Sequence, residues 1–426
     1  MNDASERMLM SWLAEGAERG PEEGLPRVLA ATRRTRQRPA WRFAPWWFRT
    51  SSFGQEAPRR QMALALVVVA LLLIAALAIG VVVGVRPRVP PAIGVASNGA
   101  LAYAAGGKVI LAGAGGAHPR LLAGSGGIDS NPTYSRDGTR FAFWSQTVAD
   151  GPLALFVANA DGSDIRKISG STAIDASPLY SPSWSPDGTR ILFSSRDGGI
   201  ERLYVVPSDG SSAPRALTDR TADRGAASWS PDGAWLAYQK VVDGTPPIES
   251  VVVARADGTG ERALYSQPLP ADEGIIDGPT WAPDSSAIVY ARPADPVLEP
   301  DLLKHGLLAV APLDGKERII FEHPTQDWIS WPGWSPDGAW IAFGTGDVGH
   351  PGAVHLIRPD GTDDRLVFRG PSQGGTNCWL VWSPDARSVI AVCGPFVEIP
   401  VDAPSNARSL GVPNETVELD WQRVAP

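Results

Sequence analysis

The stretch "WSPDGTRILF", residues 184–193, occurs with small variations six times in this chain of 426 residues. Successive copies start 50, 45, 52, 53 and 48 residues apart, and they begin at the aromatic residues Tyr134, Trp184, Trp229, Trp281, Trp334 and Trp382. A segment that recurs at such a regular interval indicates a repeat architecture in which each copy is one supersecondary unit. The fold therefore follows from what one copy can form.

Each copy predicts two strands joined by a tight turn. Proline presets φ at the second turn position, aspartate bonds its own backbone, and glycine takes a positive φ. The following residues, such as Leu236-Ala237-Tyr238, are apolar on both faces, which is typical of a strand covered on both sides. A second hairpin signal, such as Asp209-Gly210, follows 22–30 residues after the first turn. One unit is thus four antiparallel strands, the blade of a β-propeller.

The number of blades depends on the two ends of the repeat. Before the first full copy, Leu101-Ala102-Tyr103 has the pattern of a second strand, but its own first strand is weak. After the sixth copy, a lone strand ends at Trp421, which matches the end of a first strand. If that strand completes the N-terminal blade, the propeller closes without an exposed edge. The sequence thus predicts an all-β, seven-bladed propeller, with six blades as the alternative.

Taken together, the six copies resemble the blade repeat of the TolB-type propeller family over residues 92–426. The resemblance implies a propeller fold and an extracytoplasmic interaction surface, and it implies no single activity. The separate N-terminal domain of TolB has no counterpart in this sequence.

The segment Met62–Val85 contains 24 residues without a charged or polar side chain. About 20 such residues cross a bilayer as a helix, so this segment predicts a transmembrane helix better than a buried core helix or a cleaved signal peptide. Residues 1–61 carry 11 Lys/Arg against 7 Asp/Glu. By the positive-inside rule they form a cytoplasmic tail with short helices and a basic, aromatic juxtamembrane stretch. Residues 86–91 are then a linker, and the propeller lies outside the cytoplasmic membrane of a prokaryote.

The two cysteines, Cys378 and Cys393, flank the turn of the sixth copy. If Trp382 faces Val389 across the hairpin, the cysteines face each other as well. We therefore expect a cross-strand disulfide, as in an oxidising compartment, and two free buried thiols are the alternative.

The carboxylates of the repeated turn are the most conspicuous candidates for chemistry. Identical positions in separate blades lie apart around a disc, so these side chains do not converge on one substrate. We interpret them as structural turn residues, as we do the repeated aromatic residues, and a calcium site in one blade stays open. The turn aspartates are Asp137, Asp187, Asp232, Asp284, Asp337 and Asp385.

Other catalytic and metal signals are missing from the sequence. It holds neither the Gly-x-Ser-x-Gly of α/β-hydrolases nor a His-Glu-x-x-His zinc motif. We therefore predict no catalytic residue, metal or cofactor. The net charge of −8 argues against nucleic acid as a partner.

Ligand contacts are expected where the repeat is irregular. Two acidic, proline-rich insertions, residues 266–279 and 291–306, are the first candidates, and a cluster of tryptophans at positions 328, 331, 334 and 340 is the next.

Two hypotheses for the function result. In the first, a membrane-anchored propeller binds a protein, peptide or glycan outside the cell and relays this state to a cytoplasmic partner through the tail. That layout is similar to membrane-bound anti-sigma factors, although the tail also suits contact with anionic lipid. In the second, the propeller is an enzyme, a glycan lyase or hydrolase, with its active site in the central pocket.

Overall fold

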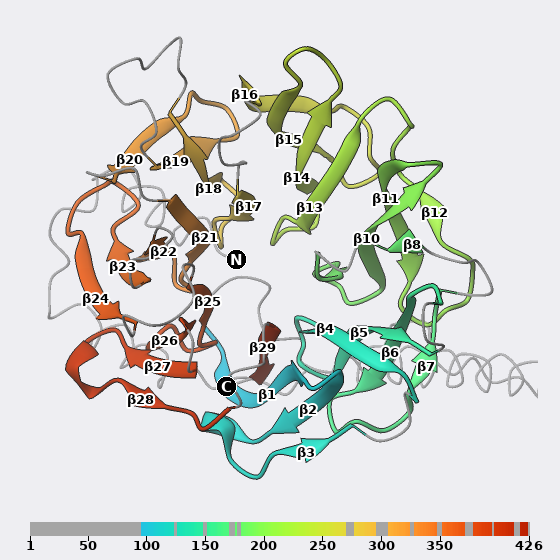
Figure 1. Cartoon of the computed structure of the whole chain (residues 1–426), viewed down its shortest axis with the longest axis horizontal. Helices are drawn as coiled ribbons and strands as arrows, with labels where there is room; N and C mark the ends of the chain where they lie inside the picture. The colour runs from blue at the N-terminus through green and yellow to red at the C-terminus, as the bar shows by residue number, and fades with distance from the viewer. Residues whose placement is uncertain are drawn as a thin grey trace, which may run out of the picture. The chain divides into compact units, whose positions relative to one another are not determined.

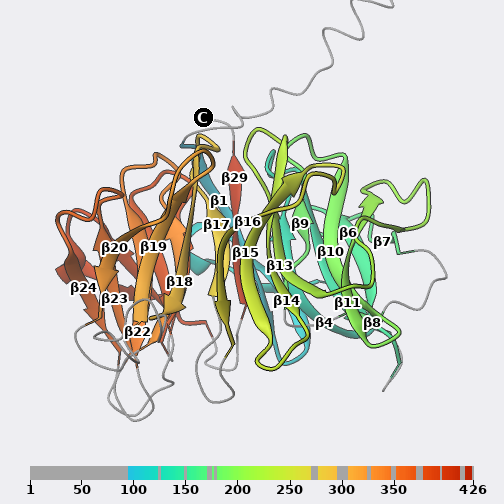
Figure 2. The ribbon, with the colours of Figure 1, turned by 90° about the horizontal axis from the view of Figure 1, so that it is seen from above.

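The computed structural model describes residues 95–122, 126–147, 151–169, 175–176, 180–269, 277–294, 306–323, 328–346, 352–370, 378–393, 396–412 and 418–424. These residues form seven antiparallel sheets. The sheets are arranged as blades around a central axis, with the first strand of each blade innermost (Figure 1). Seen from the side, the blades stand next to one another (Figure 2).

The blades are numbered here in chain order, with the mixed blade last. Blade 1 comprises β4 (Ile128–Tyr134), β5 (Arg140–Gln146), β6 (Ala154–Asn159) and β7 (Arg166–Lys167). Blade 2 comprises β8 (Asp175–Ala176), β9 (Ser183–Trp184), β10 (Arg190–Asp197), β11 (Ile200–Pro207) and β12 (Arg215–Ala216). Blade 3 comprises β13 (Asp223–Trp229), β14 (Trp235–Val242), β15 (Ile248–Arg255) and β16 (Arg262–Pro268).

Blade 4 comprises β17 (Asp277–Trp281), β18 (Ala287–Pro293), β19 (Gly306–Pro312) and β20 (Arg318–Glu322). Blade 5 comprises β21 (Trp328–Trp334), β22 (Ile341–Gly346), β23 (Ala353–Ile357) and β24 (Arg365–Arg369). Blade 6 comprises β25 (Trp379–Trp382), β26 (Ser388–Val392), β27 (Phe396–Pro400) and β28 (Arg408–Ser409). Blade 7 comprises β29 (Glu418–Val424), β1 (Ser97–Ala105), β2 (Lys108–Ala112) and β3 (Arg120–Leu121), and two short 3-10 turns lie at Ala114–Gly116 and Pro404–Asn406.

Blade 7 confirms the predicted seven-bladed closure. Its sheet has the order β29-β1-β2-β3, so the last strand of the chain is the innermost strand of the blade that the first strands build. Trp421 pairs with Leu101 across this joint. The Trp421 side chain is 4% exposed and packs with Tyr103 of the same blade and Phe396 of blade 6. The ring therefore closes by both backbone pairing and burial of apolar surface.

The hydrophobic core lies between the blades. The buried apolar side chains form seven clusters, and each cluster combines residues of two neighbouring blades. In one of them Trp144 of blade 1 meets Phe193 of blade 2 edge to face, with ring centroids 5.5 Å apart. The two apolar faces of each strand, inferred from the repeat, are thus covered by the blades on either side.

A β-bulge recurs on the innermost strands. In blades 1, 3, 4 and 5 the register shifts immediately before the repeat aromatic residue. The residue three positions before that aromatic has a positive φ in three of them: Asn131, Ala226 and Trp331. A bulge bends the strand and redirects a side chain. The side chain of the third residue before the repeat aromatic therefore points in a different direction from those of the rest of the strand.

No helix among the described residues is long and apolar enough to cross a membrane. The predicted tail (1–61), transmembrane helix (62–85) and linker (86–91) all lie outside the described part of the chain.

Candidate functional site in the central channel

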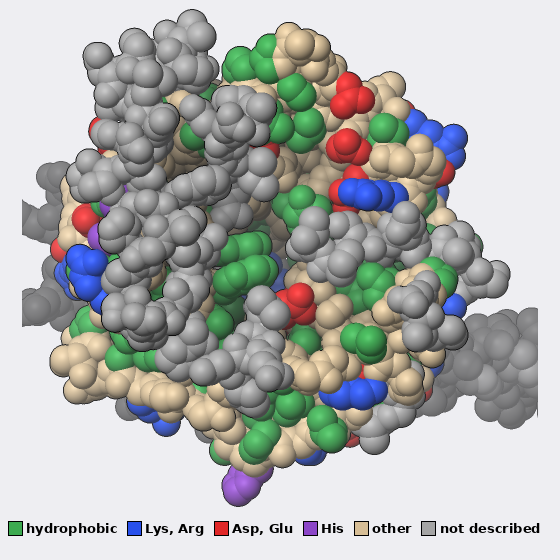
Figure 3. Space-filling model, viewed as in Figure 1, with side chains coloured by type: hydrophobic (Ala, Val, Ile, Leu, Met, Phe, Trp, Pro, Cys, Tyr) green, Lys and Arg blue, Asp and Glu red, His purple; other side chains and the backbone are tan. Residues whose placement is uncertain are grey.

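A cavity of about 590 Å³ lies on the propeller axis. Its walls come from the innermost segments of all seven blades. We call this cavity the central channel. Where side chains are visible at the centre of the face in Figure 3, hydrophobic groups lie beside an acidic one. The channel is the site that the seven blades build together.

Blades 5 and 6 contribute a pair of stacked tryptophans to the channel wall. Trp331 and Trp379 each lie three positions before the repeat aromatic residue of their blade, so they occupy equivalent places on neighbouring strands. Their ring centroids are 3.9 Å apart and their planes differ by 21°. Both side chains are partly exposed and line the cavity. The two rings cover one face of each other, and the aromatic surface that they leave exposed lies at the channel wall.

The same position in blades 7, 1 and 2 carries polar residues. A carboxylate oxygen of Glu418 accepts a hydrogen bond from the backbone N–H of Asn131. The Asn131 amide nitrogen lies 3.3 Å from the hydroxyl of Ser181, to which it donates. Burial raises the pKa of Glu418. Ala226 and Gly278 take this position in blades 3 and 4. Of these five residues, Ser181, Ala226 and Gly278 line the channel.

Asp420 is the one carboxylate among the described residues that line the channel. Its two oxygens accept hydrogen bonds from the backbone N–H groups of Tyr134, at 2.6 Å, and Trp421, at 2.8 Å. Burial raises the pKa of Asp420 to about 6, although these hydrogen bonds and the charge of Arg423 act in the opposite direction. The carboxylate thus ties β29 to β4 at the wall of the channel.

Two arginines line the channel beside Asp420. Arg136 and Arg423 each stand two positions after the repeat aromatic residue of blades 1 and 7, where the other five copies carry proline. Burial and the neighbouring positive charge of Arg423 lower the pKa of Arg136 to about 10. Burial also lowers the pKa of Arg423, and Asp420 opposes this. Arg136 remains cationic at neutral pH, because even its lowered pKa lies well above 7.

Neither arginine was predicted from the sequence, although a signal was present. Aligning the repeat on its aromatic residue shows Ser-Pro-Asp-Gly turning into Ser-Arg-Asp-Gly at residues 135–138. The same alignment puts Arg423 at the proline position after Trp421. The features that the copies share define the blade, whereas the charged residues of the channel stand at positions where the copies differ.

The turn aspartates lie in separate blades and bond their own turns. Asp187 accepts hydrogen bonds from the Ser185 hydroxyl at 2.6 Å and from the Thr189 backbone N–H at 3.0 Å and hydroxyl at 2.8 Å. Burial alone would raise its pKa, but these hydrogen bonds lower it. Five further aspartates likewise accept a hydrogen bond from the backbone N–H two residues on: Asp137, Asp232, Asp284, Asp337 and Asp385. The structure does not bring these carboxylates together.

Two of the turns keep their shape without glycine. Ser285 and Ala386 occupy the glycine position of the fourth and sixth copies, with φ of 64° and 60°. Left-handed backbone costs an L-residue about 1–2 kcal/mol, so these two copies carry strain that Gly188 avoids.

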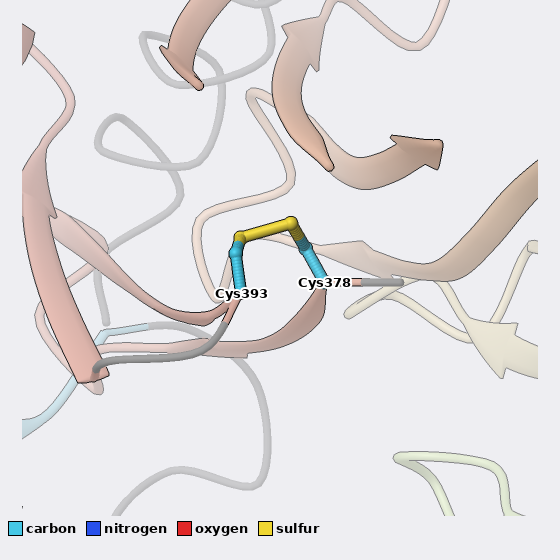
Figure 4. The surroundings of a disulfide bond; sticks show 2 residues. All are labelled: Cys378 and Cys393. Carbon is cyan, nitrogen blue, oxygen red and sulfur yellow. A yellow bond between two sulfur atoms is a disulfide. The ribbon is translucent and has the colours of Figure 1, made fainter. Parts of the chain in front are cut away.

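Cys378 and Cys393 are joined by a disulfide in the structure, with their Cα atoms 4.4 Å apart (Figure 4). They extend the ladder in which Trp382 faces Val389 and Trp379 faces Val392. Cys378 directly precedes Trp379 in the chain, so the disulfide anchors the start of the strand that carries one channel tryptophan.

The predicted tryptophan cluster is divided in the structure. Only Trp331 among the described side chains of that cluster lines the channel. Trp340 is buried within blade 5 beneath the guanidinium groups of Arg358 and Arg365, 3.7 and 4.6 Å from its ring centroid. Trp334 packs in the core between blades 4 and 5. Nothing is described for the Trp328 side chain.

Much of the two predicted insertions, residues 270–276 and 295–305, lies outside the described residues.

Within the described part of the chain no three His, Cys, Asp or Glu side chains form a possible metal site. The Nδ1 of His355 hydrogen-bonds to the carboxylate of Asp364 at 2.9 Å, and burial lowers the pKa of His355. It lies on β23, outside the channel lining.

Residues 116–299 match the family model of the TolB β-propeller domain. Among curated proteins, the chain is 25% identical over 237 residues to the uncharacterized peptidase YuxL of Bacillus subtilis, covering 54% of this chain and 32% of that protein. It is 32% identical over 114 residues to dipeptidyl-peptidase 5 of Porphyromonas endodontalis, covering 25% of this chain and 15% of that protein. The chain therefore spans about a third or less of the length of these two relatives.

Solved structures share the fold at low sequence identity. An oligogalacturonate lyase from Vibrio parahaemolyticus superposes with a TM-score of 0.52 at 12% identity, covering 74% of this chain and 86% of the other. A puromycin-hydrolyzing peptidase from Mycobacterium tuberculosis superposes with a TM-score of 0.53 at 13% identity, covering 76% of this chain and 54% of the other. The repeat and the seven blades agree with the match over residues 116–299: the chain contains a β-propeller that is similar to the TolB β-propeller domain.

Proposed function

We propose that this protein is a membrane-anchored, extracytoplasmic binding protein and that its ligand is a glycan taken into the central channel. The observation that carries the proposal is the stacked pair of Trp331 and Trp379 on the channel wall. A sugar ring has an apolar face that packs on an aromatic ring and hydroxyls that bond to polar groups at its edge. The channel supplies both, because Ser181 and other hydroxyl residues lie on the same lining.

Binding is favoured over catalysis by the set of ionisable groups at the site. Besides Tyr134 and Tyr180, the ionisable groups of the described channel lining are two guanidinium groups and one carboxylate, and that carboxylate is engaged by two backbone N–H groups. General acid–base catalysis needs a group that can reach the substrate with a free acceptor or proton. A glycan lyase or hydrolase would require further groups, and turnover is therefore one readout of the test.

The anchor and the outside location are supported by sequence features. Met62–Val85 is long and apolar enough for a membrane helix, and its basic flank suits the cytoplasmic side. The cysteine pair suits an oxidising compartment. The same proposal includes a relay of ligand binding through residues 1–61 to a cytoplasmic partner.

The experiment is a glycan array probed with the full-length protein, followed by titration of the best glycan. We compare wild type with Trp331→Gly, which removes the ring while suiting the positive φ of 51° at that residue. The matched control is Trp235→Ala, a partly buried tryptophan on β14 outside the channel lining. Loss of an aromatic contact of about 1.5 kcal/mol weakens binding about tenfold.

Retention of glycans by wild type and Trp235→Ala, with about tenfold weaker binding by Trp331→Gly, supports the proposal. Equal binding by all three proteins places the glycan outside the channel and overturns it. Retention of peptides but of no glycan overturns the ligand class. Product formation during the titration shows an enzyme instead of a binding protein.

A further inference from the structure

The central channel has an excess of positive charge where blades 1 and 7 meet. Arg136 and Arg423 belong to adjacent blades, 1 and 7, and both line the channel. The carboxylate of the lining, Asp420, is a neighbour of Arg423, and its two oxygens already accept backbone hydrogen bonds. The described side chains of the lining therefore carry two positive charges and one negative charge at neutral pH.

The two arginines are held side by side by the turn between β4 and β5. The Gln422 side chain donates a hydrogen bond of 2.7 Å to the carbonyl of Gly138 and accepts one of 2.9 Å from the backbone N–H of Ala100. A Cβ on Gly138 would stand 1.8 Å from the carbonyl oxygen of Arg423. Only glycine permits this close approach, which brings the turn that carries Arg136 against Arg423.

A purely structural role does not account for this pair. Five copies of the repeat form the same turn with proline at the position of Arg136. The Nε of Arg136 is buried, and no described residue accepts a hydrogen bond from it. Placing a second guanidinium nearby adds repulsion, which lowers the pKa of Arg136 further. An anion between the two guanidinium groups would accept a hydrogen bond from the buried Nε of Arg136 and offset the repulsion between the two cations.

We propose that Arg136 and Arg423 form a subsite for an acid group, so that the glycan taken by the central channel is anionic. This inference rests on the proposed function, because it names the chemical class of the ligand of the same channel. The acid group, a carboxylate or a phosphate, accepts hydrogen bonds from both guanidinium groups. A guanidinium fork matches either oxyanion in two parallel bonds.

The spacing of the two surfaces defines the shape of the ligand. The tryptophan pair lies three positions before the repeat aromatic residue, and the arginines lie two positions after it. Arg136 lies in the turn after β4, so the five positions span less than the about 16 Å of a fully extended strand, and the two surfaces lie at different heights along the channel. One ligand that reaches both surfaces is therefore an extended chain, with its acid group at the arginine end and a sugar ring on the tryptophans.

The test compares two tetrasaccharides that differ only in their acid groups: cellotetraose, which is neutral, and its glucuronate counterpart. Calorimetric titration of the full-length protein is expected to show at least tenfold tighter binding of the acidic compound. Inorganic phosphate, titrated alone and as a competitor, distinguishes a general oxyanion site from one selective for the carboxylated sugar. The acid preference should shrink when the ionic strength rises from about 0.01 to about 1 M, because the screening length falls about tenfold.

Two variants test the arginines themselves. Arg136→Pro restores the residue of the other repeats and so suits the turn, and Arg423→Gln removes the second charge. Each is expected to reduce the acid preference at least tenfold, since a hydrogen bond to a charged group contributes about 1.5–3 kcal/mol. The matched control, Arg408→Gln, removes an exposed arginine that pairs with Glu398 on blade 6.

The outcomes separate the two proposals. If the neutral and acidic compounds bind equally, or if both arginine variants keep the preference, the subsite is wrong and the glycan-binding channel stands. If the acidic compound binds more tightly but Trp331→Gly does not weaken it, the subsite stands and the aromatic surface is not used. If neither tetrasaccharide binds and phosphate does, the site takes an anion that is not a glycan, which overturns both.

Discussion

The closure of the ring by the last strand makes a quantitative prediction for Trp421→Ala. The Trp421 side chain is 4% exposed and packs in the core between blades 6 and 7. Its indole N–H donates a hydrogen bond of 3.2 Å to the carbonyl of Gly99. Truncating a buried tryptophan to alanine costs about 3–5 kcal/mol. This is a large part of the total stability of about 5–15 kcal/mol that is typical of folded domains.

The expected change in melting temperature follows from the size of the unit. Residues 86–426 form one compact unit. At about 2.1 cal/mol/K per residue, its unfolding entropy is about 0.7 kcal/mol/K. A loss of about 3–5 kcal/mol then lowers Tm by about 4–7 °C. Near-ultraviolet circular dichroism of the full-length protein during heating measures this shift, because it reports the packing of aromatic side chains.

The matched control is Trp229→Ala in blade 3, whose four strands are continuous in sequence. Trp229 holds the equivalent place in the repeat and is 6% exposed. Because both residues pack between blades, the two variants should lose similar stability. A Tm for Trp421→Ala within 1 °C of wild type, while Trp229→Ala falls by several degrees, would refute the closure. Trp421 would then behave as a surface residue, for which substitution costs less than about 0.5 kcal/mol.

Four further predictions concern the turns, the disulfide and the channel carboxylate. Ala386→Gly should raise Tm by up to about 1.5–3 °C, since it relieves up to about 1–2 kcal/mol of left-handed strain, whereas Gly188→Ala should lower it. Reduction of the Cys378–Cys393 disulfide should add the mass of two hydrogens to the intact protein, and no mass change would show free thiols. Reduction should also destabilise the protein by about 3 kcal/mol, the contribution of a disulfide that closes a loop of this length. The pKa of Asp187 is lowered on folding, so its contribution to stability is present above the unfolded pKa of about 4 and is lost as pH falls below that value. Asp187→Ala should therefore weaken the loss of stability in acid without changing ligand binding. The pKa of Asp420 is raised to about 6, so the folded state binds the proton more tightly and stability falls as pH rises from about 4 to 6. Asp420→Asn should remove this slope from a plot of Tm against pH. An unchanged slope would contradict the raised pKa of Asp420.

The blade architecture was predictable from the sequence because it depends on local rules repeated many times. The turn of residues 185–189 needs an acceptor, a proline and a residue tolerant of positive φ within five positions, and these are visible in the sequence. The large, small and aromatic pattern of Leu236-Ala237-Tyr238 likewise specifies burial on both faces of one strand. Even the seven-blade closure followed, since Trp421 ends a strand that has no partner within its own repeat.

The candidate site was not predictable in the same way. Trp331 and Trp379 are 48 positions apart, and only the packing of blades 5 and 6 brings their rings to 3.9 Å. Trp331 and Trp340 belong to one cluster in the sequence, but Trp331 sits at a bulge and lines the channel, while two arginines cover Trp340.

The sequence by itself determined the repeat, the turns that join its strands and the apolar faces that those strands bury. The tertiary structure decided which side chains share the central channel. Arg136 and Arg423 lie 287 positions apart, and they become neighbours because the last strand returns to the first blade. Local propensity acts over a few residues, whereas the composition of a channel on the axis depends on the order and closure of all seven blades.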